Sequence, residues 1–150
     1  MVGDINGRFS TDTWLLVHYR FRSLNRDDLL AHYRVCEIAL VTPLKDGMNL
    51  VAKEYCACCV DNDDGVLILS QFAGAAEQLK PGAVLVNPYD VEQVADTILK
   101  VFRMNDAERS ARMKRMRRVV RDQNVFWWVD SFLRAGSQIS TQSQRVSKRR

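Results

Sequence analysis

A turn in the first half of the chain carries the residues best suited to bind a phosphorylated ligand. It covers residues 42–54 and follows the apolar run 38–41, and Gly47 lets its backbone approach a ligand closely. The amides of residues 48–51 would lie unsatisfied at the start of a helix, where the helix dipole also favours an anion. We therefore predict that this turn can hold a diphosphate.

Two carboxylates accompany these amides. Asp46 lies in the turn itself, and Glu54 lies about one turn inside the predicted helix. Carboxylates accept hydrogen bonds from hydroxyl groups, so the pair suits a sugar or a ribose. The spacing also fits a second interpretation, in which Asp46 only stabilises the turn and Glu54 is a surface charge.

A second turn, residues 70–77, follows the apolar run 66–69 and is rich in glycine and alanine. It matches neither the dinucleotide-binding pattern G-x-G-x-x-G nor a phosphate-binding loop with its lysine. Two interpretations stay open for it. The turn contributes to a ligand site, or its small residues let a helix pack closely on a sheet.

The elements that must position these turns alternate between short apolar runs and helical periodicity, which is typical of βαβ units and predicts a parallel sheet. The run 38–41 is continuously apolar, which predicts a strand buried on both faces. Residues 91–102 carry a one-sided apolar stripe suited to packing on that sheet. The predicted strands are 14–19, 38–42, 66–69 and 83–86, and the predicted helices are 26–36, 49–58, 73–79, 90–102, 106–120 and 124–133.

Composition limits the chain to one folded domain. With 150 residues, 47% hydrophobic and 27% charged, it has the composition of a globular protein of one ordinary domain. No apolar run is long enough for a membrane span and the start does not resemble a secretory signal, so we expect no membrane partner and a cytoplasmic location. The four cysteines lack metal-ligand spacing. We therefore expect free thiols, no metal site and no cofactor.

The net charge of +4 comes from one end of the chain. Residues 135–150 hold four basic and no acidic side chains, and the remaining 18 basic and 18 acidic side chains cancel. The sequence thus predicts a folded domain over 1–134 and a basic disordered tail over 135–150. The basic run 109–121 has no interleaved aromatic residues, which favours a solvated helix face over a nucleic-acid surface. Nucleic-acid binding through the tail is the remaining alternative.

Three segments together resemble the donor-site signature of the trehalose-6-phosphate synthase family of retaining glycosyltransferases. They are VTPLKDGMNLVAKEY at residues 41–55, GVLILSQFAGAA at 65–76 and VLVNPYD at 84–90. The resemblance implies a GT-B enzyme with two Rossmann-like domains, of which this α/β chain is the C-terminal, donor-binding one. Residues 2–9 are similar to an internal family segment, so we expect Met1 to lie partway along a longer chain.

The resemblance also implies a role for each residue of the site. Asp46 would bond hydroxyls of the transferred glucose, Glu54 would hold the ribose of UDP-glucose, and the backbone at Leu24 would meet the uracil. No catalytic side chain is implied within this chain. The backbone that would contact glucose and diphosphate belongs to Gly47, Met48, Asn49, Leu50 and Val51.

For the whole enzyme the resemblance implies transfer of glucose from UDP-glucose to glucose 6-phosphate in trehalose biosynthesis, without a metal. Glucose 6-phosphate would bind only with the missing N-terminal domain. The basic residues that neutralise the donor diphosphate also lie upstream, so we expect little or no turnover from this chain alone. One alternative is a glucosylglycerol-phosphate synthase fragment, which would use ADP-glucose and glycerol 3-phosphate. Another is a non-catalytic truncated module that associates through its exposed interdomain surface, including Phe126 to Trp128.

Overall fold

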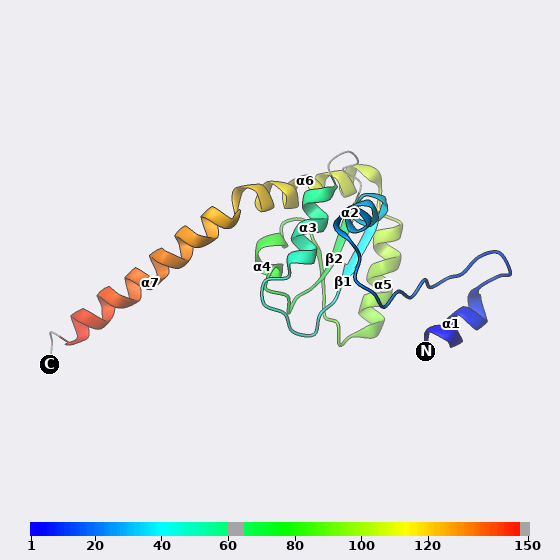
Figure 1. Ribbon diagram of the computed structural model, residues 1–150, viewed down its shortest axis with the longest axis horizontal. Coiled ribbons are helices and arrows are strands. Elements are labelled where there is room, and N and C mark those ends of the chain that lie inside the picture. Colours follow the sequence, from blue (N-terminus) through cyan, green and yellow to red (C-terminus); the bar gives the residue numbers. More distant parts are fainter. Residues whose placement is uncertain (60–64, 148–150) are drawn as a thin grey trace.

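A three-stranded parallel sheet forms the centre of the computed structural model, which describes the backbone of residues 1–59 and 65–147 and the side chains of 1–59 and 65–137. The strands are β1 (Ile38–Val41), β2 (Val66–Ser70) and β3 (Val84–Val86), in the order β1-β2-β3. Figure 1 shows most of the helices around this sheet, whereas the first and the last helix lie away from it. The predicted α/β class is therefore confirmed.

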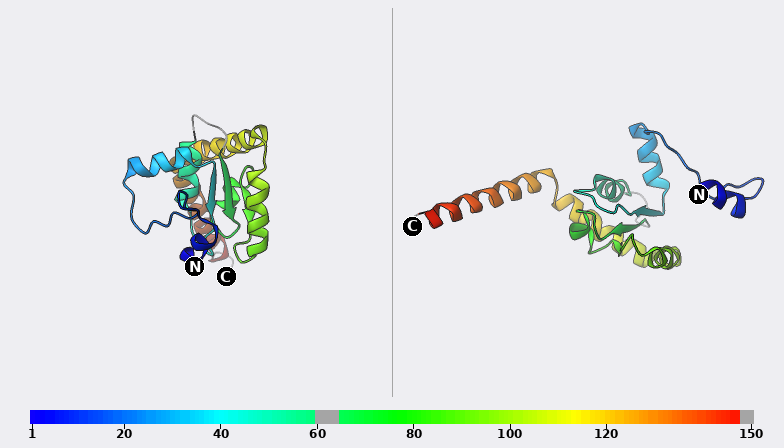
Figure 2. Two further views of the ribbon diagram at one scale, coloured as in Figure 1. Left: turned by 90° about the vertical axis from the view of Figure 1, so that its right-hand side faces the viewer. Right: turned by 90° about the horizontal axis from the view of Figure 1, so that it is seen from below.

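β2 is the central strand because Val66 to Leu69 place apolar side chains on both faces and all five residues, including Ser70, are buried. Leu67 and Leu69 pack into a core with α3 (Leu50–Cys58), α4 (Ala76–Leu79) and α6 (Asp106–Asp122). Val66 and Ile68 point to the other face and pack beneath α5 (Val91–Phe102). Figure 2 shows α3 and α5 on opposite sides of the sheet, as two helical layers over one sheet require.

Four helices begin within one residue of the predicted start, where side-chain caps satisfy their first amides, whereas the helix predicted over 73–79 has no such cap and begins only at Ala76. Each cap oxygen accepts a hydrogen bond from the amide three residues later, and it belongs to Asn or Asp in every case. Asn25 caps α2 (Arg26–Val35), and Asp90 caps α5. Asn49 and Asn105 do the same for α3 and α6.

The predicted strand 14–19 is wrong. Residues 2–9 form a helix, α1 (Val2–Phe9), and the chain then returns beside it. The Asn6 side chain donates to the Val17 carbonyl at 2.9 Å and accepts from the Val17 amide at 2.8 Å. The carboxamide thus takes the hydrogen bonds that a neighbouring strand would have made.

β1 is consequently an edge strand among the described residues rather than a strand buried on both faces. Leu40 is 47% exposed, and the other three residues of β1 are half-buried. The composition of the run 38–41 predicts burial on both faces because it reports only that the run is apolar. Whether a second strand covers it depends on distant residues, and the segment 14–19 does not pair with β1, since its one bridge joins Trp14 to Thr11.

The apolar stripe of α5 packs on the sheet only in part. Val101 is buried and Val94 half-buried against β2 and β3, as the stripe predicts. Val91, Ile98 and Phe102 are exposed, Phe102 by 68%. β3 is three residues long, so the sheet beneath α5 is too narrow to cover the whole stripe.

The last helix is longer than the sequence predicts. α7 (Val125–Ser147) continues past Leu133 through Gly136 and leaves the body at the end of α6 (Figure 1). Its backbone is helical over 135–147, where a disordered tail is expected, and residues 132–137 are all exposed. The limit of the folded domain at residue 134 stays a prediction. None of the described helices is long and apolar enough to cross a membrane.

Candidate functional site

The turn that contains Asp46 lies between the carboxyl end of β1 and the start of α3. Asn49 adopts the left-handed conformation, with φ 56°, which asparagine tolerates better than most residues. Its side-chain oxygen accepts from the Ala52 amide at 3.0 Å, while its side-chain nitrogen donates to the Asp46 carboxylate. One carboxamide therefore caps α3 and fixes the direction of the carboxylate that precedes it.

The first amides of α3 are left open by this arrangement. The amide of Ala52 is taken by Asn49, but those of Met48, Leu50 and Val51 donate to no described residue outside α3. The side chains at these three positions are exposed. A helix start with several free amides has the geometry and the partial positive charge that bind an anion.

The second glycine-containing turn supports the first one directly. The Gly74 amide donates to the Asp46 carbonyl at 3.2 Å, and Ala73 forms a parallel β-bridge with Asp46. A Cβ atom added to Gly74 would lie 1.5 Å from the carbonyl oxygen of Gly47. Neither open interpretation of this turn included that role. Glycine is needed here so that two backbones can touch, and only the arrangement of β1 and β2 brings them together.

The supporting turn is itself tied to the rest of the sheet edge. The Ser70 hydroxyl accepts from the Phe72 amide at 3.1 Å, and the Gln71 amide donates to the Val86 carbonyl at 3.0 Å. Phe72 meets the ring of Tyr89 edge-on, with centroids 5.8 Å apart. Turns after β1, β2 and β3 thus brace one another at the carboxyl edge, where open parallel sheets bind ligands.

Glu54 lies on the side of α3 that faces α2. The Tyr33 hydroxyl donates to Glu54 Oε2 at 3.1 Å, which leaves the other carboxylate oxygen available. Burial, and then the nearby Glu54 carboxylate, raise the pKa of Tyr33 to about 12. Tyr33 therefore stays a hydrogen-bond donor across the physiological range. Leu24 is half-buried and directly precedes the Asn25 cap of α2, so it belongs to a different segment from the Asp46 turn.

The cysteines lie away from this edge, in the helical layer or at the end of α2. Cys56 and Cys59 are buried in the core around α3, and burial raises the pKa of the Cys56 thiol to about 12. All four cysteines are free thiols. Over the described ranges 1–59 and 65–147, no three His, Cys, Asp or Glu side chains gather as metal ligands would.

The fold and this edge define a class of protein: an α/β domain whose parallel strands end in turns suited to a phosphorylated ligand. Residues 1–138 match the model of glycosyltransferase family 20, and the chain belongs to that family. The resemblance inferred from the three sequence segments is thereby confirmed.

Similar proteins narrow the class further. The trehalose-6-phosphate synthase of Sodalis glossinidius is 46% identical over 97% of this chain and 31% of its own length. A UDP-forming α,α-trehalose-phosphate synthase from Burkholderia xenovorans, solved with glucose 6-phosphate, superposes with TM-score 0.83 at 43% identity over 89% of this chain and 30% of its own. The E. coli protein bound with UDP-2-fluoro glucose gives TM-score 0.83 at 40% identity, with the same coverage of both chains.

This chain therefore spans about a third of the length of the relatives that it matches. The expected GT-B relationship is confirmed by the solved synthases, which share the fold of the chain over nine-tenths of its length. The substrates named for these relatives were observed with proteins about three times as long as this chain.

Proposed function

We propose that this chain is the donor-binding part of a trehalose-6-phosphate synthase and that it binds UDP-glucose at the carboxyl edge of its sheet. The observation that carries the proposal is the start of α3, where open amides adjoin a fixed carboxylate in a chain of glycosyltransferase family 20. Similarity to a protein solved with a UDP-sugar analogue supports the same ligand class.

Each part of the donor has a proposed partner. The backbone of Gly47 to Val51 receives the diphosphate and the near side of the glucose, because charge-assisted bonds from open amides suit phosphate oxygens. Asp46 accepts hydrogen bonds from glucose hydroxyls, in the direction that Asn49 fixes. Glu54 accepts from the ribose hydroxyls through the oxygen that Tyr33 leaves available. The backbone at Leu24 meets the uracil.

The whole enzyme then transfers glucose to glucose 6-phosphate with retention and releases UDP. Breaking the bond between glucose and the diphosphate places negative charge on the UDP, which the α3 amides stabilise through fixed dipoles. Those amides supply partial charges rather than full cations. We therefore propose that the chain alone binds the donor with little or no turnover, and that glucose 6-phosphate requires the remainder of the longer protein.

Calorimetric titration with UDP-glucose, UDP and ADP-glucose tests this proposal. Asp46→Asn and Glu54→Gln keep the shape of the side chain and remove its charge, and Glu92→Gln on α5 is the matched control at an exposed glutamate. We expect saturable binding of UDP-glucose that Glu92→Gln preserves and the other two variants weaken at least tenfold. Absence of binding by the folded wild-type chain contradicts the proposal, and tighter binding of ADP-glucose favours the glucosylglycerol-phosphate synthase alternative.

A further inference from the structure

The Tyr33 side chain lies in the junction between α2 and α3. Its ring meets the Tyr55 ring edge-on, with centroids 6.3 Å apart, and packs against the core around α3. The Tyr55 hydroxyl donates to the Cys36 carbonyl at 2.9 Å, and the Cys59 thiol donates to the Tyr33 carbonyl at 3.8 Å. These contacts hold the end of α2 against α3, so the Tyr33 ring has a fixed place beside that helix.

Glu54 depends on Tyr33 for its orientation. The Glu54 side chain is exposed on α3, and among the described residues the Tyr33 hydroxyl is its one hydrogen-bond partner, 3.1 Å from Oε2. No cation of the described part of the chain forms an ion pair with this carboxylate. A glutamate without a partner samples several rotamers, and a ligand must remove that freedom when it binds. The Tyr33 hydroxyl removes part of it in advance.

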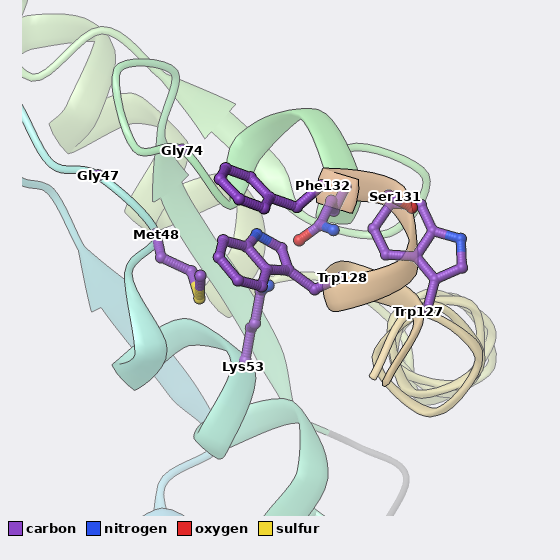
Figure 3. Close-up of a pocket in the computed structure, with 9 residues that line it drawn as sticks. Gly47, Met48, Lys53, Gly74, Trp127, Trp128, Ser131 and Phe132 are labelled. Carbon is purple, nitrogen blue, oxygen red and sulfur yellow. The ribbon is translucent and has the colours of Figure 1, made fainter. Parts of the chain in front are cut away.

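The two sides of α3 serve different parts of the proposed donor. One side adjoins a cavity of about 530 Å³, which Figure 3 shows between the two turns and the aromatic rings of α7. Gly47 and Lys53 line this cavity, whereas Glu54 is not among its lining residues and faces α2. The sugar of the proposed donor therefore lies on the cavity side, at the Asp46 turn, and the ribose lies on the α2 side, where Tyr33 is the side chain that holds Glu54.

We propose that Tyr33 is a positioning residue for the ribose of the donor and makes the site selective for nucleotides with free ribose hydroxyls. This inference rests on the proposed binding of UDP-glucose. Tyr33 occupies Oε2, so Glu54 meets the ribose with its other oxygen already directed. A nucleotide without ribose hydroxyls offers that oxygen no donor, and a polar group left unpaired in a site disfavours such a ligand. The selectivity thus belongs to the pair rather than to Glu54 alone.

The test compares UDP with 2′,3′-dideoxy-UDP, which lacks both ribose hydroxyls, by calorimetry on the full chain. We expect the wild type to bind UDP about 10- to 150-fold more tightly, as for one hydrogen bond to a charged group. Tyr33→Phe removes the hydroxyl and keeps the ring. We expect it to weaken UDP binding about tenfold, which corresponds to the rotamer freedom that Glu54 regains, and to leave binding of the dideoxy nucleotide unchanged.

Two controls separate positioning from structural damage. Tyr55→Phe removes the hydroxyl of the neighbouring ring, which bonds the Cys36 carbonyl and not Glu54. Damage to the junction of α2 and α3 should lower the affinities for both nucleotides in equal proportion, so we expect Tyr55→Phe to keep the wild-type ratio. In Glu54→Ala nothing is left to position, so adding Tyr33→Phe should leave its UDP affinity unchanged.

The ratio of the two affinities decides the outcome. If the wild type binds UDP and Tyr33→Phe keeps the wild-type ratio, Tyr33 does not position Glu54, and the proposed function stands without it. Equal weakening of both nucleotides by Tyr33→Phe would show a structural role only. A change of ratio in Tyr55→Phe as large as in Tyr33→Phe would also overturn the inference. Failure of the folded wild type to bind UDP overturns the proposed function and this inference together.

Discussion

Replacement of Gly74 by alanine tests whether the two turns really depend on each other. The new Cβ would lie 1.5 Å from the Gly47 carbonyl oxygen and 2.7 Å from its carbonyl carbon. To restore the 3.4 Å of an ordinary contact, the two turns must move apart by about 2 Å. Both contacting atoms belong to the backbone, so no side-chain rotation can relieve the clash.

The separation has a stability cost and a binding cost. At 3.2 Å, the hydrogen bond from the Gly74 amide to the Asp46 carbonyl cannot survive a movement of that size. Its loss costs about 1 kcal/mol, and overpacking adds about 1–3 kcal/mol to the loss in the free energy of unfolding. Displacement of reacting groups by 1 Å costs about 10²-fold in catalysis. We therefore expect UDP-glucose affinity to fall at least tenfold in Gly74→Ala.

Urea unfolding and calorimetry on the same preparation measure both effects. Gly7→Ala on α1 is the control, because a Cβ there meets nothing within 4 Å. If Gly74→Ala loses about 2–4 kcal/mol of unfolding free energy but is still folded at low temperature, its UDP-glucose affinity can be measured there on the folded protein. If Gly74→Ala matches Gly7→Ala in both stability and UDP-glucose affinity, the turns are not coupled and the reasoning is refuted.

Three further predictions concern the body and the surface. The Arg109 side chain is 8% exposed and donates to the carbonyls of Val101, Phe102 and Met104 at 3.0–3.2 Å. Arg109→Met should therefore lower the free energy of unfolding in urea by about 2–4 kcal/mol. A decrease under about 0.5 kcal/mol would show that these hydrogen bonds are not needed. The Cys56 thiol ionises near pH 9 in the unfolded chain, while burial raises its pKa in the folded chain to about 12. The free energy of unfolding should therefore fall from about pH 9 towards pH 12, by up to about 1.4 kcal/mol per pH unit. Cys56→Ala should reduce that slope in alkaline urea titrations, and an equal slope in both proteins would contradict the assignment. Because α5 and α7 expose apolar side chains, light scattering should show association that grows with concentration. Phe126→Lys should lessen this association. A monomer at every concentration would exclude association through these surfaces.

Local chemistry was sufficient to predict the elements around the site. The run from Val66 to Leu69 is continuously apolar and forms a strand, and the helix predicted over 49–58 begins one residue later, at Leu50, because the Asn49 side chain accepts from the Ala52 amide three residues away. Such features depend on neighbours in sequence, so the sequence predicts them directly. The turn with Asp46 and its open amides follows from the same short-range rules.

Features that depend on distant residues were not predictable in this way. The Asn6 side chain takes both backbone groups of Val17, where a strand was predicted, although nothing near Val17 in the sequence signals it. The contact between Gly74 and Gly47 joins two turns 27 residues apart, and it exists only because β1 and β2 are neighbours in the sheet. A glycine whose φ is unremarkable has no local signature, so its importance emerges only from the tertiary arrangement.

The central claim is that the open amides at the start of α3 receive the diphosphate of UDP-glucose. A chain of 17.2 kDa suits amide-resolved NMR, so UDP can be titrated while each backbone amide is followed. The account predicts that the largest, saturable shifts occur at Met48, Leu50 and Val51, with Gly74 responding through its contact to the same turn. Saturable shifts confined to other amides, or none at all from the folded chain, would contradict it.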